Sequence, residues 1–552
     1  MSDNTPREPG LTRRSVLKTG GAALAIAATG PQLVMPAEAQ SPKRGGTLRL
    51  TFQADPLHFD PHQTLSFVTM VPLSFVYSRL VKVKAGPSVK PMTYPVEPDL
   101  AESWTQQNDT TYVFKLKKGV RWHNKPPVNG RELTAEDVKY TYERFLTIAG
   151  NPNKPALEYI DRIEALDKHT VKFTLKEPNA WFLDLLAGTS TWIVAKECVD
   201  KFGDLKKVES VVGTGPWMLE RWEPNVKLSY VRNPNYFVSG LPYADSVEML
   251  IDKDPASRLA TWLAGKTDFG PEYQHAVRWL DAPVARQRKP GLQTAEYTWL
   301  TSGATGFKLS NPPFNDVRVR RALSRASNLA ELFESLAFSQ GHWTPNPAVP
   351  AAFADWAIPI DQLGPEGRKL YEFNTAEAKK LLAEAGLPNG FKTPVEAAAT
   401  VYGPDYDDFV QITLKNWQAA GIQGDLKLKE YGAFITSTIF GKFDGMFLGL
   451  RGAWADPEAY FYRWYMPGQP LNVWGVNDPK LTEMIRLQRR TFDVAKRKQI
   501  VFDIQRYLAD QALFGVDGSI KILSAWDAHI KNYMPNNGFD YGGRLMAAWI
   551  DK

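Results

Sequence analysis

The chain has 552 residues, of which 66 are basic and 60 acidic, and a single cysteine, Cys198. The small positive excess is spread along the chain without long runs of like charge, which is not the pattern of a nucleic-acid-binding protein. One cysteine excludes an internal disulfide, a thiolate metal cluster and a CxxC redox pair. The length suits two or three lobes. The 17 tryptophans fit either a large core or a ligand cleft lined by aromatic rings.

The N-terminus has the pattern of an export signal. Arg13 and Arg14 lie in the sequence TRRSVLK, which precedes a Gly- and Ala-rich apolar run and then the sequence AEA at 37–39. We therefore expect a twin-arginine signal peptide over residues 1–39, cleaved before Gln40, and a periplasmic mature protein. Glycine and proline interrupt the apolar run, which is too short to predict a stable membrane span.

The first half of the mature chain alternates strand and helix patterns. The segment GGTLRLTF, just after Lys43, has the period of a strand, and so do residues 112–116 and 170–175. Thr134 stands three residues before Asp137, a spacing that predicts a capping box at the start of a helix. Residues 212–236 predict a strand, a Pro-Asn turn and another strand that ends in a turn.

The second half continues the alternation. Gly386 is the expected end of one helix, because glycine is favoured just after a helix C-terminus. A strand near 520–523 is expected to return the chain to the first lobe. Apolar residues at helical spacing predict helices within 254–269, 371–386, 409–420 and 493–511.

Catalytic and metal-binding motifs are missing. The sequence contains neither HExxH nor GxSxG. His58 and His62 are four residues apart, but Pro61 lies between them, so we favour two polar loop residues over a metal site. The adjacent acids Asp407 and Asp408 are expected to be solvated. We predict no catalytic residue, no metal and no cofactor.

Residues 100–144 carry the most specific pattern, the sequence LAESWTQQNDTTYVFKLKKGVRWHNKPPVNGRELTAEDVKYTYER. This stretch resembles the signature region of the large extracellular solute-binding proteins (family 5) that serve peptide, nickel and opine ABC importers. Residues 212–217, 232–236 and 312–323 resemble the same family. The resemblance implies an α/β fold of the periplasmic-binding-protein type (type II, cluster C), with two lobes, a hinge and an inserted subdomain.

This resemblance implies a division of the mature chain into lobes. We expect the first lobe to comprise three separate segments and the second lobe to be continuous. The expected parts are the signal peptide 1–39, the first lobe 40–86, 208–296 and 515–552, the inserted subdomain 87–207, and the second lobe 297–514.

In this family the ligand lies between the lobes, and residues 441–460 correspond to one wall of the pocket. Asp456, followed by proline, matches the family's acidic-Pro turn, where aspartate also has a structural role. Peptide-binding relatives place a carboxylate for the ligand's ammonium three residues earlier, where this chain has Ala453. Nearby, Trp454 offers a flat apolar face. Arg451 suits a ligand carboxylate or phosphate, and equally an ion pair with a surface carboxylate.

A second departure concerns the loop before the helix near 409. Dipeptide-binding relatives carry an arginine for the ligand's carboxylate two residues before an aromatic residue; here Tyr402 keeps the aromatic and Thr400 replaces the arginine. Tyr402 is a candidate contact. Trp299 is another, although core packing is favoured for it. Because both peptide-end contacts are missing, we expect a larger or modified ligand, such as a longer or blocked peptide, an opine or a glycoside.

The sequence thus favours a monomeric solute receptor that closes its lobes on a peptide or related solute and docks on a membrane permease, peripheral to the membrane. ATP hydrolysis would occur on the ATPase of that transporter. A different class, a twin-arginine-exported hydrolase or metal-dependent oxidoreductase, is disfavoured by the missing motifs. A receptor that feeds a chemosensor, or a periplasmic folding chaperone, is a third hypothesis.

Overall fold

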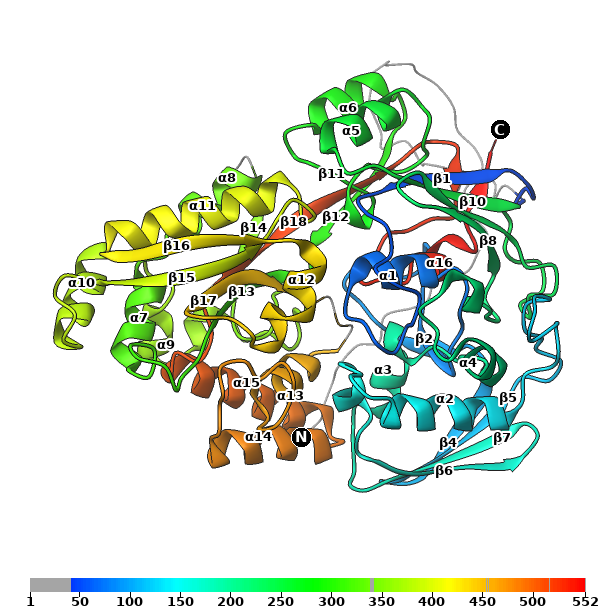
Figure 1. Cartoon of the computed structure of the whole chain (residues 1–552), viewed down its shortest axis with the longest axis horizontal. Helices are drawn as coiled ribbons and strands as arrows, with labels where there is room; N and C mark the ends of the chain where they lie inside the picture. The colour runs from blue at the N-terminus through cyan, green and yellow to red at the C-terminus, as the bar shows by residue number, and fades with distance from the viewer. Residues whose placement is uncertain (1–40, 338–341, 453, 455, 516, 552) are drawn as a thin grey trace, which may run out of the picture. The chain divides into compact units, whose positions relative to one another are not determined.

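Four sheets of four strands each organise the residues that the computed structural model describes, namely 41–337, 342–452, 454, 456–515 and 517–551. Residues 43–552 form one unit (Figure 1). The predicted signal peptide, residues 1–39, lies outside the described residues, as does Ala453.

Sheet I contains the first strand of the mature chain. Its order is β1-β10-β9-β8, with β1 parallel to β10. Leu48 and Leu50 of β1 are fully buried, as the alternating sequence predicts. The carboxylate of Asp254 caps the following helix, α5, by accepting from the backbone N–H of Ser257 at 2.6 Å. The bounds are β1 (Thr47–Phe52), β8 (Trp217–Glu223), β9 (Lys227–Arg232), β10 (Ser246–Ile251) and α5 (Pro255–Leu263).

The insert sheet comprises the strands within residues 101–175, in the order β4-β5-β7-β6, and helix α2 packs on it. Tyr142 of α2 meets Phe173 of β7 edge to face, with ring centroids 5.2 Å apart. The carboxylate of Asp137 accepts from the backbone N–H of Thr134 at 2.9 Å, one of the two bonds of the predicted capping box. The bounds are β4 (Ala101–Asn108), β5 (Thr111–Leu116), α2 (Ala135–Thr147), β6 (Ile160–Asp167) and β7 (Thr170–Leu175).

Two of the segments that carry the sequence resemblance meet at a buried histidine. His123 Nδ1 accepts from the backbone N–H of Gly213 at 3.3 Å, and its Nε2 lies 3.1 Å from the carbonyl oxygen of Gly215. The backbone N–H of His123 also donates to the carbonyl of Gly213 at 2.8 Å. Stretch 100–144 is therefore held against the residues just before β8 by hydrogen bonds to both nitrogens of the His123 imidazole.

Gly213 is required by this close approach. A Cβ atom at this position would lie 2.1 Å from the backbone oxygen of Val76. We expect Gly213→Ala to lower the free energy of unfolding by about 1–3 kcal/mol, because the backbone must shift to relieve the overlap. Urea denaturation followed by circular dichroism measures this. Gly432→Ala is the control, since its Cβ would meet only side-chain ends, Glu430 Oε2 at 3.0 Å and Leu57 Cδ2 at 3.6 Å; equal losses in both variants would contradict the expectation.

Sheet II is formed by later strands in the order β13-β17-β15-β16, and α11 packs along β16 (Figure 1). Helix α10 ends just before Gly386, whose φ of 84° confirms the predicted stop. The bounds are β13 (Ser302–Phe307), α7 (Val317–Arg325), α8 (Leu329–Ala337), α10 (Thr375–Glu384), β15 (Phe391–Ala398), α11 (Pro404–Ala419), β16 (Ile422–Lys429), α12 (Tyr431–Thr436) and β17 (Met446–Arg451).

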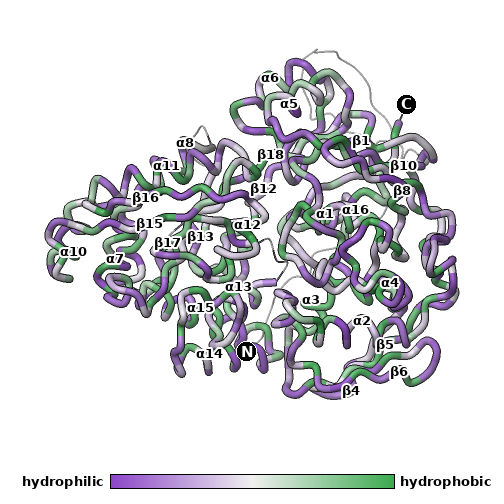
Figure 2. The backbone as a smooth tube through the Cα atoms, in the orientation of Figure 1, coloured by the Kyte–Doolittle hydropathy of each residue, from purple (hydrophilic) through white to green (hydrophobic). Residues whose placement is uncertain are grey.

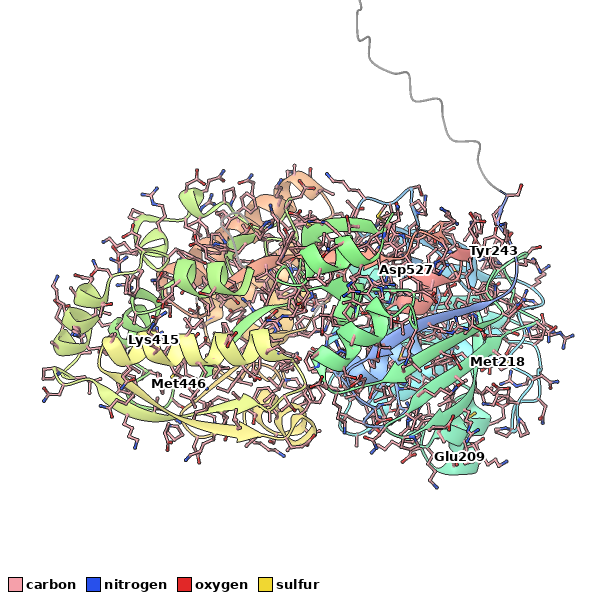
Figure 3. All side chains as sticks on the ribbon, turned by 90° about the horizontal axis from the view of Figure 1, so that it is seen from above. Glu209, Met218, Tyr243, Lys415, Met446 and Asp527 are labelled. Carbon is pink, nitrogen blue, oxygen red and sulfur yellow. The ribbon has the colours of Figure 1, made fainter. Side chains whose placement is uncertain are left out.

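The connecting sheet links the part of the unit that contains sheet I to the part that contains sheet II. Strand β18 pairs antiparallel with β12 and β11 through its C-terminal part and with β14 through its N-terminal part. Figure 3 accordingly shows Asp527, just after β18, in the same part of the unit as Met218, and Lys415 and Met446 in the other part. The bounds are β11 (Ala276–Val277), β12 (Gln293–Thr298), β14 (Trp343–Asn346) and β18 (Asp517–Trp526).

Several helices and short strands complete the fold. Helix α14 packs on α15, and α13 contacts the insert near residue 154. No helix in the described part of the chain is long and apolar enough to cross a membrane, and Figure 2 shows hydrophobic and hydrophilic residues interspersed along the backbone. These elements are α1 (Phe67–Leu73), β2 (Val81–Val83), β3 (Val96–Pro98), α3 (Phe182–Leu186), α4 (Lys196–Phe202), α6 (Ala282–Arg288), α9 (Pro365–Lys369), α13 (Ala459–Tyr465), α14 (Pro479–Arg490), α15 (Val494–Asp510), α16 (Tyr541–Leu545), β19 (Ile530–Lys531) and β20 (Trp549–Ile550).

Candidate ligand-binding site

A cavity of about 310 Å³ is lined by residues of the insert, of helix α1, of the connecting sheet and of the loops beside sheet II. This volume is within the range of pockets that bind small molecules. Five of the residues singled out from the sequence line the cavity: Trp299, Tyr402, Arg451, Trp454 and Asp456. The sixth, Ala453, lies outside the described residues.

Aromatic rings from different elements meet at one wall of the cavity. Tyr402, in the loop before α11, stacks on Phe67 of α1 with centroids 6.4 Å apart. Its ring also meets Tyr406 and Tyr431 edge to face, at 4.9 and 5.4 Å. The neighbouring Thr400 has a φ of 57°, which places this non-glycine residue in the left-handed region. All four of these aromatic residues line the cavity.

Trp299 follows β12 and is half-buried beside the cavity. Its ring lies 6.2 Å from that of Tyr273. Its buried indole Nε1 has no hydrogen-bond partner among the described residues. Core packing and a ligand contact are both compatible with this position, and an indole N–H is a donor that a ligand oxygen could satisfy.

Arg451 is buried at the end of β17. It donates to the carbonyl oxygens of Gly303 and Ala348, at 3.3 and 3.0 Å, and forms an ion pair with Asp517 at 3.3 Å. The predicted alternative of an ion pair at the surface was therefore wrong in one respect: the pair is internal. Burial raises the pKa of Asp517 to about 6, and the positive charge of Arg451 opposes that rise. Much of the charge of Arg451 is balanced within the protein.

Asp456 is buried where the chain turns into α13. Its carboxylate accepts from the backbone N–H of Ala459 at 2.8 Å, so it orders the turn as the sequence predicts. Burial raises its pKa, and the charge of Arg463 opposes this rise. Asp456 thus combines a structural hydrogen bond with a position on the cavity wall.

Residues 95–471 match the sequence family described as bacterial extracellular solute-binding proteins, family 5 middle. The chain belongs to this family. Di/tripeptide-binding protein 1 of Pseudomonas aeruginosa is 26% identical over 488 residues, covering 83% of this chain and 86% of that protein.

Solved structures of periplasmic binding proteins share the fold. DppA of Helicobacter pylori in complex with the peptide STSA has a TM-score of 0.80 at 23% identity, covering 92% of this chain and 99% of that chain. AgaA of A. tumefaciens R10 in complex with agropinic acid has a TM-score of 0.79 at 22% identity, with 92% and 99% coverage. The fold is thus that of type II periplasmic binding proteins, and the family comprises binding proteins rather than enzymes.

Several charged residues that line the cavity were not singled out from the sequence of this family 5 chain, among them Asp184 and Arg463. Asp184 lies on α3 of the insert; burial raises its pKa to about 7, and the nearby charge of Asp456 adds to the rise. Arg463 lies on α13 and is buried. Each is a lone charge in a strongly apolar run, LLAG following Asp184 and YFY preceding Arg463. A charge within such a run is the signal that could have identified them.

In the part of this family 5 chain that the structure describes, no three His, Cys, Asp or Glu side chains are grouped to hold a metal ion. His62 instead lies fully buried beside Arg144, whose guanidinium donates to Asp60 at 2.5 Å and to His62 Nδ1 at 2.8 Å. Burial lowers the pKa of His62 to about 4. Both ring nitrogens of His62 thus lie within hydrogen-bonding distance of protein groups, since its Nε2 is 3.2 Å from the carbonyl oxygen of Trp192.

Proposed function

We propose that this chain is the periplasmic substrate-binding component of an ABC importer, which captures a peptide or related solute in the cavity by lobe closure. It would deliver the solute to a membrane permease driven by an ATPase, as a monomer peripheral to the membrane. The observation that carries the proposal is a cavity lined from both sides of the connecting sheet, by Phe67 and Asp184 on one side and Tyr402 and Trp454 on the other. Hinged closure of two parts around a ligand is a common way to couple binding to a change of state.

The proposal includes the lobe boundaries and the export route expected from the sequence. Residues 40–86, 208–296 and 515–552 would form the first lobe and 297–514 the second, with 87–207 inserted. Twin-arginine export would remove residues 1–39. The separate sheets I and II, joined by the long strand β18, support this division.

We further propose that the solute is not a free dipeptide held by both ends. Thr400 and Ala453 stand at the two positions where the family resemblance implies charged anchors for the ends of a peptide. Relatives named for peptides support a peptide-like solute, and the AgaA complex with agropinic acid is a precedent for an opine in this fold. A longer or blocked peptide, an opine or a glycoside would suit the mostly aromatic wall.

Mass spectrometry of the ligand released from protein purified natively out of the periplasm tests the proposal. A peptide-like or opine-like molecule in stoichiometric amount is the expected result. Protein that never carries a small molecule, under any growth condition, would contradict the transport role. Nanomolar binding of unmodified dipeptides in calorimetry would contradict the ligand class alone.

Trp454→Ala should weaken binding of the released ligand by about 1–3 kcal/mol. The ring of Trp454 lines the cavity and packs edge to face on Tyr460, with centroids 5.4 Å apart. Calorimetry with the released compound measures the change. The matched control is Trp104→Ala, which removes a half-buried tryptophan of the insert sheet, away from the cavity lining. Unchanged affinity in folded Trp454→Ala protein would remove this ring from the site.

A further inference from the structure

Five arginines line the cavity, and four of them are engaged by other parts of the chain. Three form ion pairs with carboxylates, and Arg544 donates to the backbone carbonyls of Asn536 and Gly538. The three ion pairs are Arg79–Asp540 at 2.5 Å, Arg278–Asp405 at 2.6 Å and Arg451–Asp517 at 3.3 Å. Arg463 is the arginine that remains.

Arg463 is 4% exposed. Its one hydrogen bond among the described residues is a long one, 3.4 Å from Nη1 to the side-chain oxygen of Asn153 in the insert. Its Nε has no partner there, and its guanidinium forms no ion pair with a described carboxylate. A buried guanidinium so poorly matched is expensive unless an anion accompanies it.

The two carboxylates whose charges act on Arg463, Asp456 and Glu458, form no ion pair with it. Asp456 accepts the backbone N–H of Ala459 at 2.8 Å, and Glu458 pairs with Arg489 at 3.1 Å. Both attract Arg463 from a greater distance, while burial is the main influence and lowers the pKa of Arg463. The protein therefore does not supply the close anionic partner that a planar guanidinium accommodates best.

An apolar face lies beside this guanidinium. The centre of the Arg463 guanidinium is 5.2 Å from the ring centroid of Trp454, and both residues line the cavity. Stacking of this kind fixes the plane of the guanidinium and leaves its edge for a bidentate partner. Asn153, which accepts from Arg463, is itself held, because its amide donates to the carbonyl of Thr64 at 2.8 Å.

We propose that Arg463 is the anion anchor of the ligand site and binds a carboxylate of the solute, while Trp454 covers the apolar part next to it. This rests on the proposed function and narrows the ligand to solutes with a free carboxylate. The sequence places Thr400 where the family resemblance implies an arginine, so the anchor would come from another part of the chain. Because Asn153 belongs to the insert and Arg463 to α13, the bound carboxylate would also join the two sides of the cavity.

Two matched peptide sets test the proposal on ligand-stripped, refolded full-length protein. One is a set of N-acetylated tripeptides with a free C-terminal carboxylate, and the other is the same set as C-terminal amides. Native mass spectrometry measures which members are retained. Wild-type protein should retain the acids at least about tenfold better than the amides, the effect of one charge-assisted hydrogen-bonded pair.

Variants separate the anchor from general charge and from folding. Arg463→Gln should retain acids and amides alike, and Arg463→Lys, which keeps the charge and loses the planar fork, should show a reduced preference. The control is Arg320→Gln, which removes an arginine that is also buried, lies outside the cavity and donates to backbone carbonyls. It should keep the wild-type preference. Thermal unfolding of each variant shows which of them are folded.

The outcomes distinguish this inference from the proposed function. Equal retention of acids and amides by wild-type protein, or an undiminished acid preference in Arg463→Gln, overturns the anchor and leaves peptide capture intact. The same loss of preference in Arg320→Gln also overturns it. Retention of neither set by wild-type protein contradicts the peptide class in the proposed function and the anchor with it.

Discussion

Replacing Arg489 by alanine should lower the free energy of unfolding by about 3–5 kcal/mol. Arg489 and Glu458 are each 2% exposed and form an ion pair at 3.1 Å. The guanidinium also lies over the rings of Tyr159 and Tyr462, at 4.5 and 3.8 Å from their centroids. Truncation would leave Glu458 buried without its cation, and burial already raises the pKa of that carboxyl to about 7.

Urea denaturation followed by circular dichroism, near pH 7.5, measures the loss. The neighbouring Arg490→Ala is the control, because Arg490 pairs with Glu483 at the surface and its removal should cost less than about 1 kcal/mol. Adding Glu458→Gln to Arg489→Ala should restore part of the stability, since the uncompensated charge is then gone. A loss below about 1 kcal/mol in Arg489→Ala would show that the Arg489–Glu458 ion pair contributes no more to stability than a surface pair does.

This ion pair belongs to a contact between the insert and helices α13 and α14. The indole N–H of Trp181 donates to the side-chain oxygen of Gln488 at 2.7 Å, and the hydroxyl of Tyr462 donates to Glu158 at 2.5 Å. Arg463, the proposed anion anchor, lies on the same helix as Tyr462. The contact therefore fixes the helix that presents the anchor, and it joins the two sides of the cavity at a place distinct from the connecting sheet.

Local sequence patterns predicted most elements, and the differences have physical reasons. Strand β7 has the predicted bounds, 170–175. Helix α11 starts at Pro404, five residues before the predicted 409. The prediction began too late because proline at the first helical position and acidic residues in the first turn resemble a loop when read alone. The sequence predicts a strand at 426–429, whereas β16 already starts at Ile422, because parallel pairing with β15 extends it beyond its apolar part.

The site was less predictable than the fold, because tertiary contacts decide its chemistry. The motif comparison indicated which loops face the cavity, and Tyr402 and Trp454 line it. It did not indicate that Arg451 would be paired with Asp517, 66 residues away along the chain. Nor did it single out Arg463, whose lack of a close partner becomes visible only when the neighbouring carboxylates are seen to be engaged elsewhere.

His123 should make the protein less stable in acid. Its imidazole is fully buried, and burial lowers its pKa from 6.5 to about 4. The folded-state pKa is below the unfolded value, so neutral His123 contributes stability above pH 6.5 that is lost as the pH falls toward 4. A shift of this size corresponds to about 3 kcal/mol. Protonation would also break the bond from the N–H of Gly213 to Nδ1, because a protonated Nδ1 has no lone pair to accept it.

Urea denaturation of wild-type protein and His123→Gln, at a series of pH values from about 7.5 to about 4.5, measures this contribution. A glutamine side chain can accept from Gly213 and donate to Gly215, as neutral histidine does, but it does not titrate. The variant should therefore lose less stability than the wild type on acidification. Because His62, also buried, is present in both proteins, the difference between the two curves isolates His123. Identical pH dependence in the two proteins would show that this imidazole does not protonate on unfolding in that range, and that the link between the two signature segments is not the acid-sensitive one.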